Sequence, residues 1–271
     1  MKLSKILMFA ALFALTACGG GAAKGQEVEA KKAKEVANNI ATTSKDVKTV
    51  EFSMEMTDYD AEEKKTSNST YTYKLAENGD IYCATYGSGV NSDGKPSSSS
   101  TALHVVKNDK YDEVFCFTSK SSSSTEDTMM VYGKKGNETI YATMTASIGA
   151  ATITMTQTMY LSFTSPAELI DEAEAEKLSG YDVKYYSSGD KNLTIDIKVS
   201  RETKVSEEDD TKTVTASYVY NNGLFSSFEM SAEYFSGDKM DQKCSAKYSG
   251  VKIPDLPDGW ESKINQSLLG L

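Results

Sequence analysis

The sequence predicts an α+β fold that is mostly β, in which a large curved antiparallel sheet is covered by two or three helices. Three observations predict it. From Thr49 onward apolar and polar residues alternate, short turn sequences separate the alternating runs, and three segments show helical spacing instead. Because strands twist, a sheet of about a dozen of them is expected to curl.

The alternating runs are typical of strands with one buried face. Residues 50–56 alternate apolar with acidic or hydroxyl side chains, and residues 71–75 continue the pattern. Asn78-Gly79 supplies the positive φ of a tight hairpin, and Asn222-Gly223 repeats the signal. We therefore predict hairpin-connected strands in an antiparallel meander. Further runs lie at 81–86, 102–106, 112–118, 129–132, 139–146 and 153–163.

Three segments break this period and predict helices. Residues 27–45 carry an apolar stripe at helical spacing opposite charged residues. Ser165-Pro166-Ala167-Glu168 combines an N-cap residue, a first-turn Pro and a capping-box Glu, and Gly180 is expected to end that helix. A third helix is expected near the C-terminus, where apolar residues stand four apart at Trp260, Ile264 and Leu268. We expect the concave face of the sheet to cover these stripes.

The N-terminus predicts an exported, lipid-anchored protein. Lys2 and Lys5 precede an uncharged apolar run over residues 6–15, which is typical of a signal peptide. Leu15-Thr16-Ala17-Cys18 resembles the bacterial lipobox, in which the Cys is lipidated and becomes the new N-terminus. We predict a signal peptide over 1–17, a flexible tether over 18–26 and a single domain over 27–271. The alternative is an ordinary signal peptide with a coincidental Cys.

Lipidation of Cys18 would place the protein in the cell envelope with the membrane as its partner. Each buried methylene contributes ~0.8 kcal/mol, so two or three acyl chains, palmitate among them, hold a protein firmly. Gly19 replaces the Asp that often retains such lipoproteins at an inner membrane. The resemblance therefore favours the outer membrane, on its periplasmic or its surface face.

Composition argues against nucleic-acid binding and against most catalytic chemistry. The chain has 39 acidic and 29 basic residues and a formal net charge of −10, which leaves no basic excess to neutralise phosphates. It has one histidine, His104, which we interpret as a solitary half-buried residue. No nucleophile-elbow, metalloprotease, P-loop or dinucleotide motif occurs. We expect a protein that is not an enzyme and has no cofactor.

The cysteines leave a disulfide open as an alternative, and the acidic clusters leave Ca²⁺ binding open. Cys83, Cys116 and Cys244 are too widely spaced for a metal knuckle, so we expect buried thiols or one disulfide, for which Cys83–Cys116 is the candidate pair. Residues 58–63 and 207–210 are acidic but lack the EF-hand pattern. We interpret them as charged hairpin loops, with Ca²⁺ binding as the alternative, and predict no metal site.

The order of elements over residues 27–260 resembles the LolA/LolB-like fold of lipoprotein carriers and small lipid-binding lipoproteins. The Tyr218–Phe225 hairpin and the closing Val251-Lys252-Ile253-Pro254 carry the resemblance. It implies a half-barrel of strands curled around helices, with an apolar cavity for acyl chains. The lid-latching Arg of the carriers has no match, because Arg201 is the only Arg and lies in a late strand. A lipid or other hydrophobic ligand is therefore implied rather than lipoprotein sorting.

Met and Tyr suit an adaptable cavity lining, because Met repacks easily and Tyr combines an apolar body with a hydroxyl. The predicted function is a membrane-anchored lipoprotein that binds a lipid or acyl chain in this cavity. The alternative is a cell-surface interaction or structural lipoprotein with a filled core, no small-molecule ligand and an unknown protein partner. The cavity candidates are Phe52, Met54, Met56, Tyr71, Tyr73, Met155 and Met159.

Overall fold

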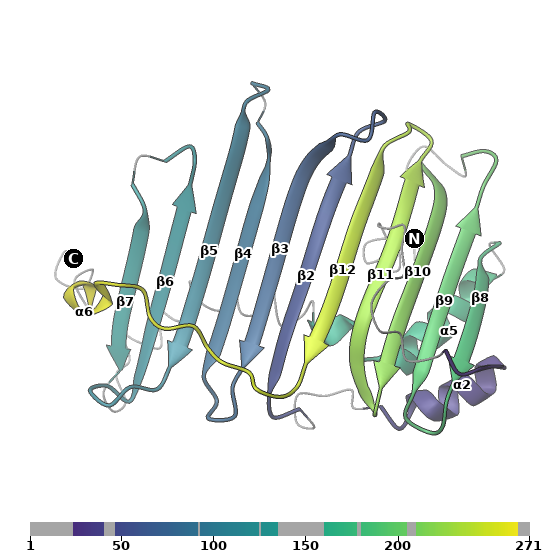
Figure 1. Ribbon diagram of the computed structural model, residues 1–271, viewed down its shortest axis with the longest axis horizontal. Helices are drawn as coiled ribbons and strands as arrows, with labels where there is room; N and C mark the ends of the chain where they lie inside the picture. Colours follow the sequence, from purple (N-terminus) through teal and green to yellow (C-terminus); the bar gives the residue numbers. More distant parts are fainter. Residues whose placement is uncertain are drawn as a thin grey trace. The chain divides into compact units, whose positions relative to one another are not determined.

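Antiparallel strands dominate the fold, as the sequence predicts (Figure 1). The computed structural model describes residues 24–40, 47–91, 93–124, 126–134, 160–177, 180–204 and 210–264. Their strands form one sheet in the order β1-β8-β9-β10-β11-β12-β2-β3-β4-β5-β6-β7. The strands are β1 Gln26–Val28, β2 Val50–Tyr59, β3 Lys65–Leu75, β4 Ile81–Val90, β5 Pro96–Val106, β6 Glu113–Ser121, β7 Thr128–Lys134, β8 Asp182–Ser187, β9 Leu193–Ser200, β10 Thr211–Asn221, β11 Leu224–Tyr234 and β12 Lys239–Lys247.

The expected meander is present, but as two runs rather than one. Strands β2 to β7 are neighbours in chain order, and so are β8 to β12. The predicted turns close their hairpins: Gly79 has φ +88°, and Asn222 and Gly223 have φ +54° and +76°. Two consecutive positive φ values are what a tight I′ turn requires, which is why Asn-Gly stands there.

Contacts divide the chain into two compact units. The first unit comprises residues 1–46, 54–68 and 161–246, and the second comprises 47–53, 69–160 and 247–271.

Two helices of the first unit, α2 (Ala30–Ala37) and α5 (Pro166–Glu176), contact each other, and α2 also contacts β8 and β9. α2 is shorter than the predicted helix over 27–45, because residues 26–28 pair with β8 as strand β1. α5 begins at Pro166 as predicted. The Ser165 side chain makes no capping bond, and its carbonyl accepts the Leu169 N–H instead.

Aromatic rings fill the core of the first unit. The register places Ile195, Tyr218 and Phe228 opposite one another on one sheet face. The rings of Tyr218 and Phe228 lie 4.4 Å apart, and Phe163 lies 5.0 Å from Phe228. The buried Tyr220 hydroxyl donates to the Phe163 carbonyl at 3.0 Å, so this polar group is satisfied within the core.

Residues 160–162 correct the predicted strand over 153–163, because they are helical. The Thr164 N–H and its hydroxyl both donate to the Leu161 carbonyl, at 3.0 and 2.8 Å, and these bonds close a helical turn. The rest of that run and the run at 139–146 lie outside the described residues. No helix in the described part of the chain is long and apolar enough to cross a membrane.

In the second unit, one part of the sheet over β4 to β6 has buried residues on both faces. Cys83, Leu103 and Phe115 are buried on one face, and His104 and Cys116 on the other. Cys83 and Cys116 thus point to opposite faces and lie two strands apart, beyond the ~7 Å Cα separation that a disulfide allows. The three cysteines of the described chain are buried thiols.

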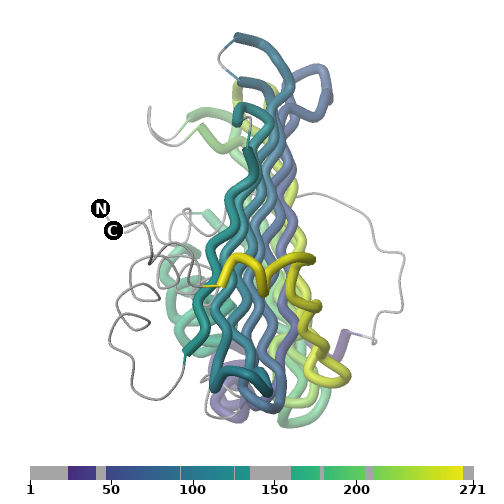
Figure 2. The backbone as a smooth tube through the Cα atoms, turned by 90° about the vertical axis from the view of Figure 1, so that its left-hand side faces the viewer, coloured from purple at the N-terminus to yellow at the C-terminus, as the bar shows by residue number. Residues whose placement is uncertain are grey.

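The C-terminal segment covers one of these faces. It runs as a yellow trace across the strands to α6 (Trp260–Lys263), which lies against β7 in both views (Figures 1 and 2). The predicted helix through Trp260 and Ile264 ends at Lys263, since Ile264 is extended and forms a parallel bridge with Val131. Leu268 lies outside the described residues.

Candidate functional site

The face under the C-terminal segment has an apolar, covered part. Three buried residues, Val114, Cys116 and Val131, form its centre. The C-terminal segment packs onto them with Leu256, Trp260 and Ile264. Such contacts fasten the segment to β6 and β7 by burial of apolar area.

His104 lies at the edge of this covered part and is 3% exposed. Its ring lies 4.8 Å from that of Tyr82, and Cys116 is its cross-strand partner on β6. Neither ring nitrogen makes a hydrogen bond to another described residue. Burial lowers the pKa of His104, and the backbone of Asp255, which does not meet hydrogen-bond geometry with the ring, offsets this effect only in part. The imidazole is therefore neutral at neutral pH, and more deeply buried than the sequence suggested.

The neighbouring His104 and Cys116 do not form an activated pair. Burial raises the pKa of the Cys116 thiol to about 11, so the sulfur stays protonated. A nucleophilic cysteine needs the opposite shift, which a partner imidazolium would cause. Both groups are neutral here, and they serve as buried side chains.

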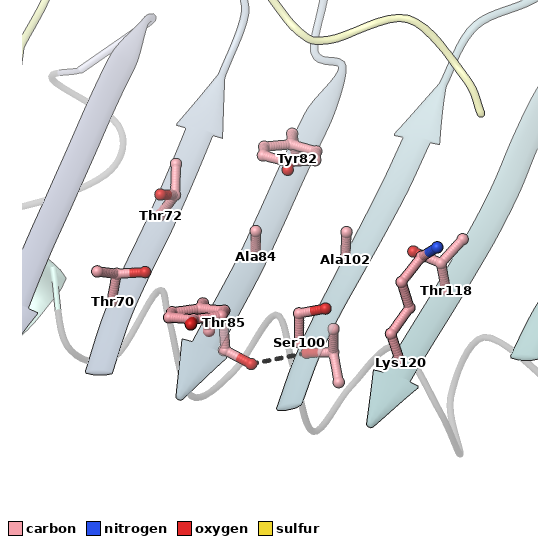
Figure 3. A pocket seen from close by; sticks show the side chains of 11 residues that line it. Thr70, Thr72, Tyr82, Ala84, Thr85, Ser100, Ala102, Thr118 and Lys120 are labelled. Atoms are coloured by element: carbon pink, nitrogen blue, oxygen red, sulfur yellow. Dashed lines mark hydrogen bonds between the residues drawn. The ribbon is translucent and has the colours of Figure 1, made fainter. Parts of the chain in front are cut away.

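Beyond His104 the same face forms a polar hollow of about 260 Å³ (Figure 3). Four adjacent strands contribute to it, β3, β4, β5 and β6. Ala84 and Ala102 face each other across β4 and β5, and their small side chains leave the space. The hollow is lined by Thr70, Thr72, Tyr82, Ala84, Thr85, Tyr86, Ser100, Thr101, Ala102, Thr118 and Lys120.

Hydroxyl groups surround this alanine floor. In Figure 3, Thr70 and Thr72 lie on one side, Thr118 on the other and Tyr82 at one end. Tyr86, which is 43% exposed, is paired with Ser100 at the opposite end. The side chains of Thr85 and Thr101, the next pair along these strands, point to the opposite face of the sheet and bond each other at 2.8 Å.

A second hollow, of about 450 Å³, lies in the first unit among acidic loops and includes Asp58, Asp60, Asp210 and Lys239. Its charges have partners: Asp60 accepts two backbone N–H groups, Asp210 pairs with Lys204 at 2.7 Å, and Lys239 pairs with Glu63 at 2.5 Å. No group of three ligands that could hold a metal occurs among the described residues. Residues 58–63 thus form a charged hairpin loop, as predicted, whereas 207–209 of the second acidic cluster lie outside the described residues.

Three of the seven predicted cavity residues are packed into the core. Phe52 and Tyr73 are buried, and their rings lie 5.6 and 6.1 Å from that of Tyr160. The sulfur of Met54, which is also buried, accepts a hydrogen bond from Gln242 Nε2 at 2.5 Å.

The other predicted site residues are half-buried or lie outside the described part of the chain. Met56 and Tyr71 are half-buried. Cys18, Met155 and Met159 lie outside the described residues. The alanine-floored hollow was missed from the sequence. Its available signal was Ala84 and Ala102, because alanine is depleted in strands and leaves space wherever two meet across a pair.

Comparisons with known proteins give only distant likenesses. No family model and no curated protein matches the sequence. The fold is similar to a DUF1329 family protein from Desulfovibrio piger, with a TM-score of 0.22 and 10% identity over 85% of this chain and 96% of that one. It is also similar to the outer membrane protein Omp33 of Acinetobacter baumannii, with a TM-score of 0.17 and 8% identity over 74% and 99% of the two chains. Likenesses at this level transfer no function.

Proposed function

We propose that this protein is a lipid-anchored lipoprotein of the cell envelope that acts by binding through an exposed sheet surface, with a core filled by its own side chains. One observation supports the filled core. Three predicted cavity positions are buried against other side chains of the protein, namely Phe52, Met54 and Tyr73. An acyl chain would have to displace these contacts, and a packed core resists added volume at a cost of about 1–3 kcal/mol.

The anchor rests on Cys18 and the signal sequence that precedes it. Fractionation of cells that express the full chain or its Cys18→Ser variant tests it. We expect the full chain in the membrane fraction, with an intact mass that starts at Cys18 and includes acyl chains. The variant should lose that added mass. A wild-type chain without acyl mass would contradict the anchor.

A hydrophobic-ligand carrier is the second candidate, and the half-buried Tyr71 beside buried Tyr73 on β3 favours it. Native mass spectrometry separates the two functions. The full chain, purified in detergent, is incubated with vesicles of phosphatidylethanolamine and phosphatidylglycerol and then analysed. The filled core predicts that only covalent acyl chains remain. Lipid retained at one copy per chain, and lost in Tyr73→Ala, would support the carrier and contradict the filled core.

A further inference from the structure

We propose that the alanine-floored hollow on β3–β6 binds one pyranose ring of a neutral carbohydrate. This inference names a ligand for the proposed binding function and rests on that function. It does not depend on the proposed lipid anchor at Cys18. The hollow combines an apolar floor, aromatic side chains at two ends and hydroxyls along its sides. A sugar ring is complementary to this set, since it has apolar C–H faces and a rim of hydroxyls.

The floor sets the size of the ligand. Ala84 and Ala102 are cross-strand partners, so their side chains lie side by side and neither reaches beyond a methyl group. The resulting space of about 260 Å³ is smaller than the ~300–1,000 Å³ typical of sites for drug-sized ligands. It suits a single six-membered ring, with the adjoining units of a longer glycan in solvent.

Aromatic side chains at two ends supply a surface for the apolar side of that ring. Tyr86 is 43% exposed, so its ring is accessible to a ligand, and its hydroxyl can also bond one. Tyr82 is held against His104 at 4.8 Å, so its position is fixed before a ligand arrives. Fixed aromatic contacts reduce the entropy lost on binding.

Hydroxyls provide the polar contacts. No hydrogen bond joins the side chains of Thr70, Thr72, Ser100 or Thr118 to another described residue, although all four line the hollow. Each hydroxyl can donate one bond and accept two. A hydrocarbon chain seated here would leave these groups without partners, which disfavours a lipid tail.

The charges around the hollow favour a neutral ligand over an anion. Lys120 is its one lysine, and this lysine forms an ion pair with Asp127 across the turn to β7. An anionic ligand would have to compete with that carboxylate. The net charge of −10 further opposes anions at the surface.

Methyl NMR of the full chain tests the proposal. The protein, ¹³C-labelled at alanine methyl groups and held in zwitterionic micelles without sugar headgroups, is titrated with methyl β-D-glucopyranoside, methyl β-D-galactopyranoside, methyl α-D-mannopyranoside and N-acetylglucosamine. Cyclohexanol serves as a ring without the rim of hydroxyls. We expect saturable shifts at Ala84 and Ala102 with at least one glycoside and none with cyclohexanol.

Variants then locate the binding. Ala102→Leu fills the floor and should raise Kd at least tenfold, and Tyr86→Ala, at an exposed position, should raise it about fivefold without affecting folding. Thr118→Val removes one hydroxyl at constant shape and should raise Kd about fivefold. Thr128→Val, an exposed threonine on β7 away from the hollow, is the matched control and should leave Kd unchanged.

Three results would overturn the sugar site: no shift with any glycoside at 100 mM, equal shifts with cyclohexanol, or a Kd that the hollow variants leave unchanged. None of these depends on Cys18, because the protein is purified in micelles whether or not it is acylated. Failure of the anchor would appear only in the fractionation and mass measurements, so the two failures are distinguishable.

Discussion

Replacing His104 by leucine should stabilise the second unit. The histidine is 3% exposed, and neither of its ring nitrogens bonds another described residue. A buried polar group without a partner costs about 1–3 kcal/mol. His104→Leu removes that cost at similar volume and loses the ring contact with Tyr82, which contributes about 0.5–1.5 kcal/mol. The middle of these two ranges gives a net gain of about 1 kcal/mol at pH 7.5.

The gain should grow as the pH falls. Burial lowers the pKa of His104 below its ordinary value of 6.5, so the unfolded chain takes up a proton before the folded one does. Below pH 6.5 the wild type therefore loses up to about 1.4 kcal/mol of stability per pH unit, until the folded-state pKa is reached. His104→Leu lacks this loss, and no other histidine titrates in the chain.

Urea unfolding measured by tryptophan fluorescence between pH 5.5 and 7.5 gives the stability difference at pH 7.5 and its change with pH. The single tryptophan, Trp260, packs on the apolar cluster beside His104 and reports on the second unit. Asp241, whose pKa is raised mainly by burial, titrates in both proteins, so its effect cancels in the difference. A variant less stable than the wild type at pH 7.5, or a stability difference independent of pH, would refute the reasoning.

Three further changes test the packing. Gly133→Ala would place a methyl against the Tyr111 ring and 2.7 Å from Ile264 Cδ1, and should lower the unfolding free energy by about 1–3 kcal/mol in urea. Gly87→Ala, whose methyl meets nothing closer than 3.8 Å, should leave it unchanged, and equal effects would contradict the clash. Phe228→Ala should cost about 3–5 kcal/mol, measured by circular dichroism in urea, and a loss under 1 kcal/mol would contradict the aromatic core. Native Cys116, with its pKa near 11, should react with iodoacetamide at pH 8 at least tenfold slower than in urea, as followed by peptide mass spectrometry, and equal rates would contradict its burial.

Local patterns predicted the strands because a period of two and a positive-φ turn are local properties. Gly79 and Asn222-Gly223 adopt the expected conformations, and α5 begins at Pro166. Errors arose where a local choice depends on a distant partner. Residues 27 and 28 belong to the helix predicted over 27–45, yet together with Gln26 they pair with β8. Tertiary pairing overrides a marginal helix propensity in this way.

The candidate site was harder to predict, because it depends on which strands become neighbours and on which face. A sequence marks Ala84 and Ala102 as small residues, but only the β4–β5 register brings them together. The same register separates Cys83 from Cys116 and makes His104 the neighbour of Cys116. The spacing of these residues along the chain predicts neither arrangement. A shift of the strand register by one residue would move each side chain to the other face of the sheet.

The polarity of β5 and β6 explains why the hollow stays open beside a covered surface. Along one face of β6, Val114 and Cys116 precede Thr118 and Lys120, and on β5 the change comes between His104 and Ala102. The C-terminal segment needs apolar partners for its own side chains and finds them where β6 begins and β5 ends, at Val114, Cys116 and Val106. In Figure 3 its yellow trace passes on the Tyr82 side, away from Lys120. If Thr118 and its polar neighbours served only as solvated surface, Thr118→Leu should be tolerated in every assay. If they bind a sugar, that change should abolish binding while the unfolding free energy stays within about 0.5 kcal/mol of the wild type.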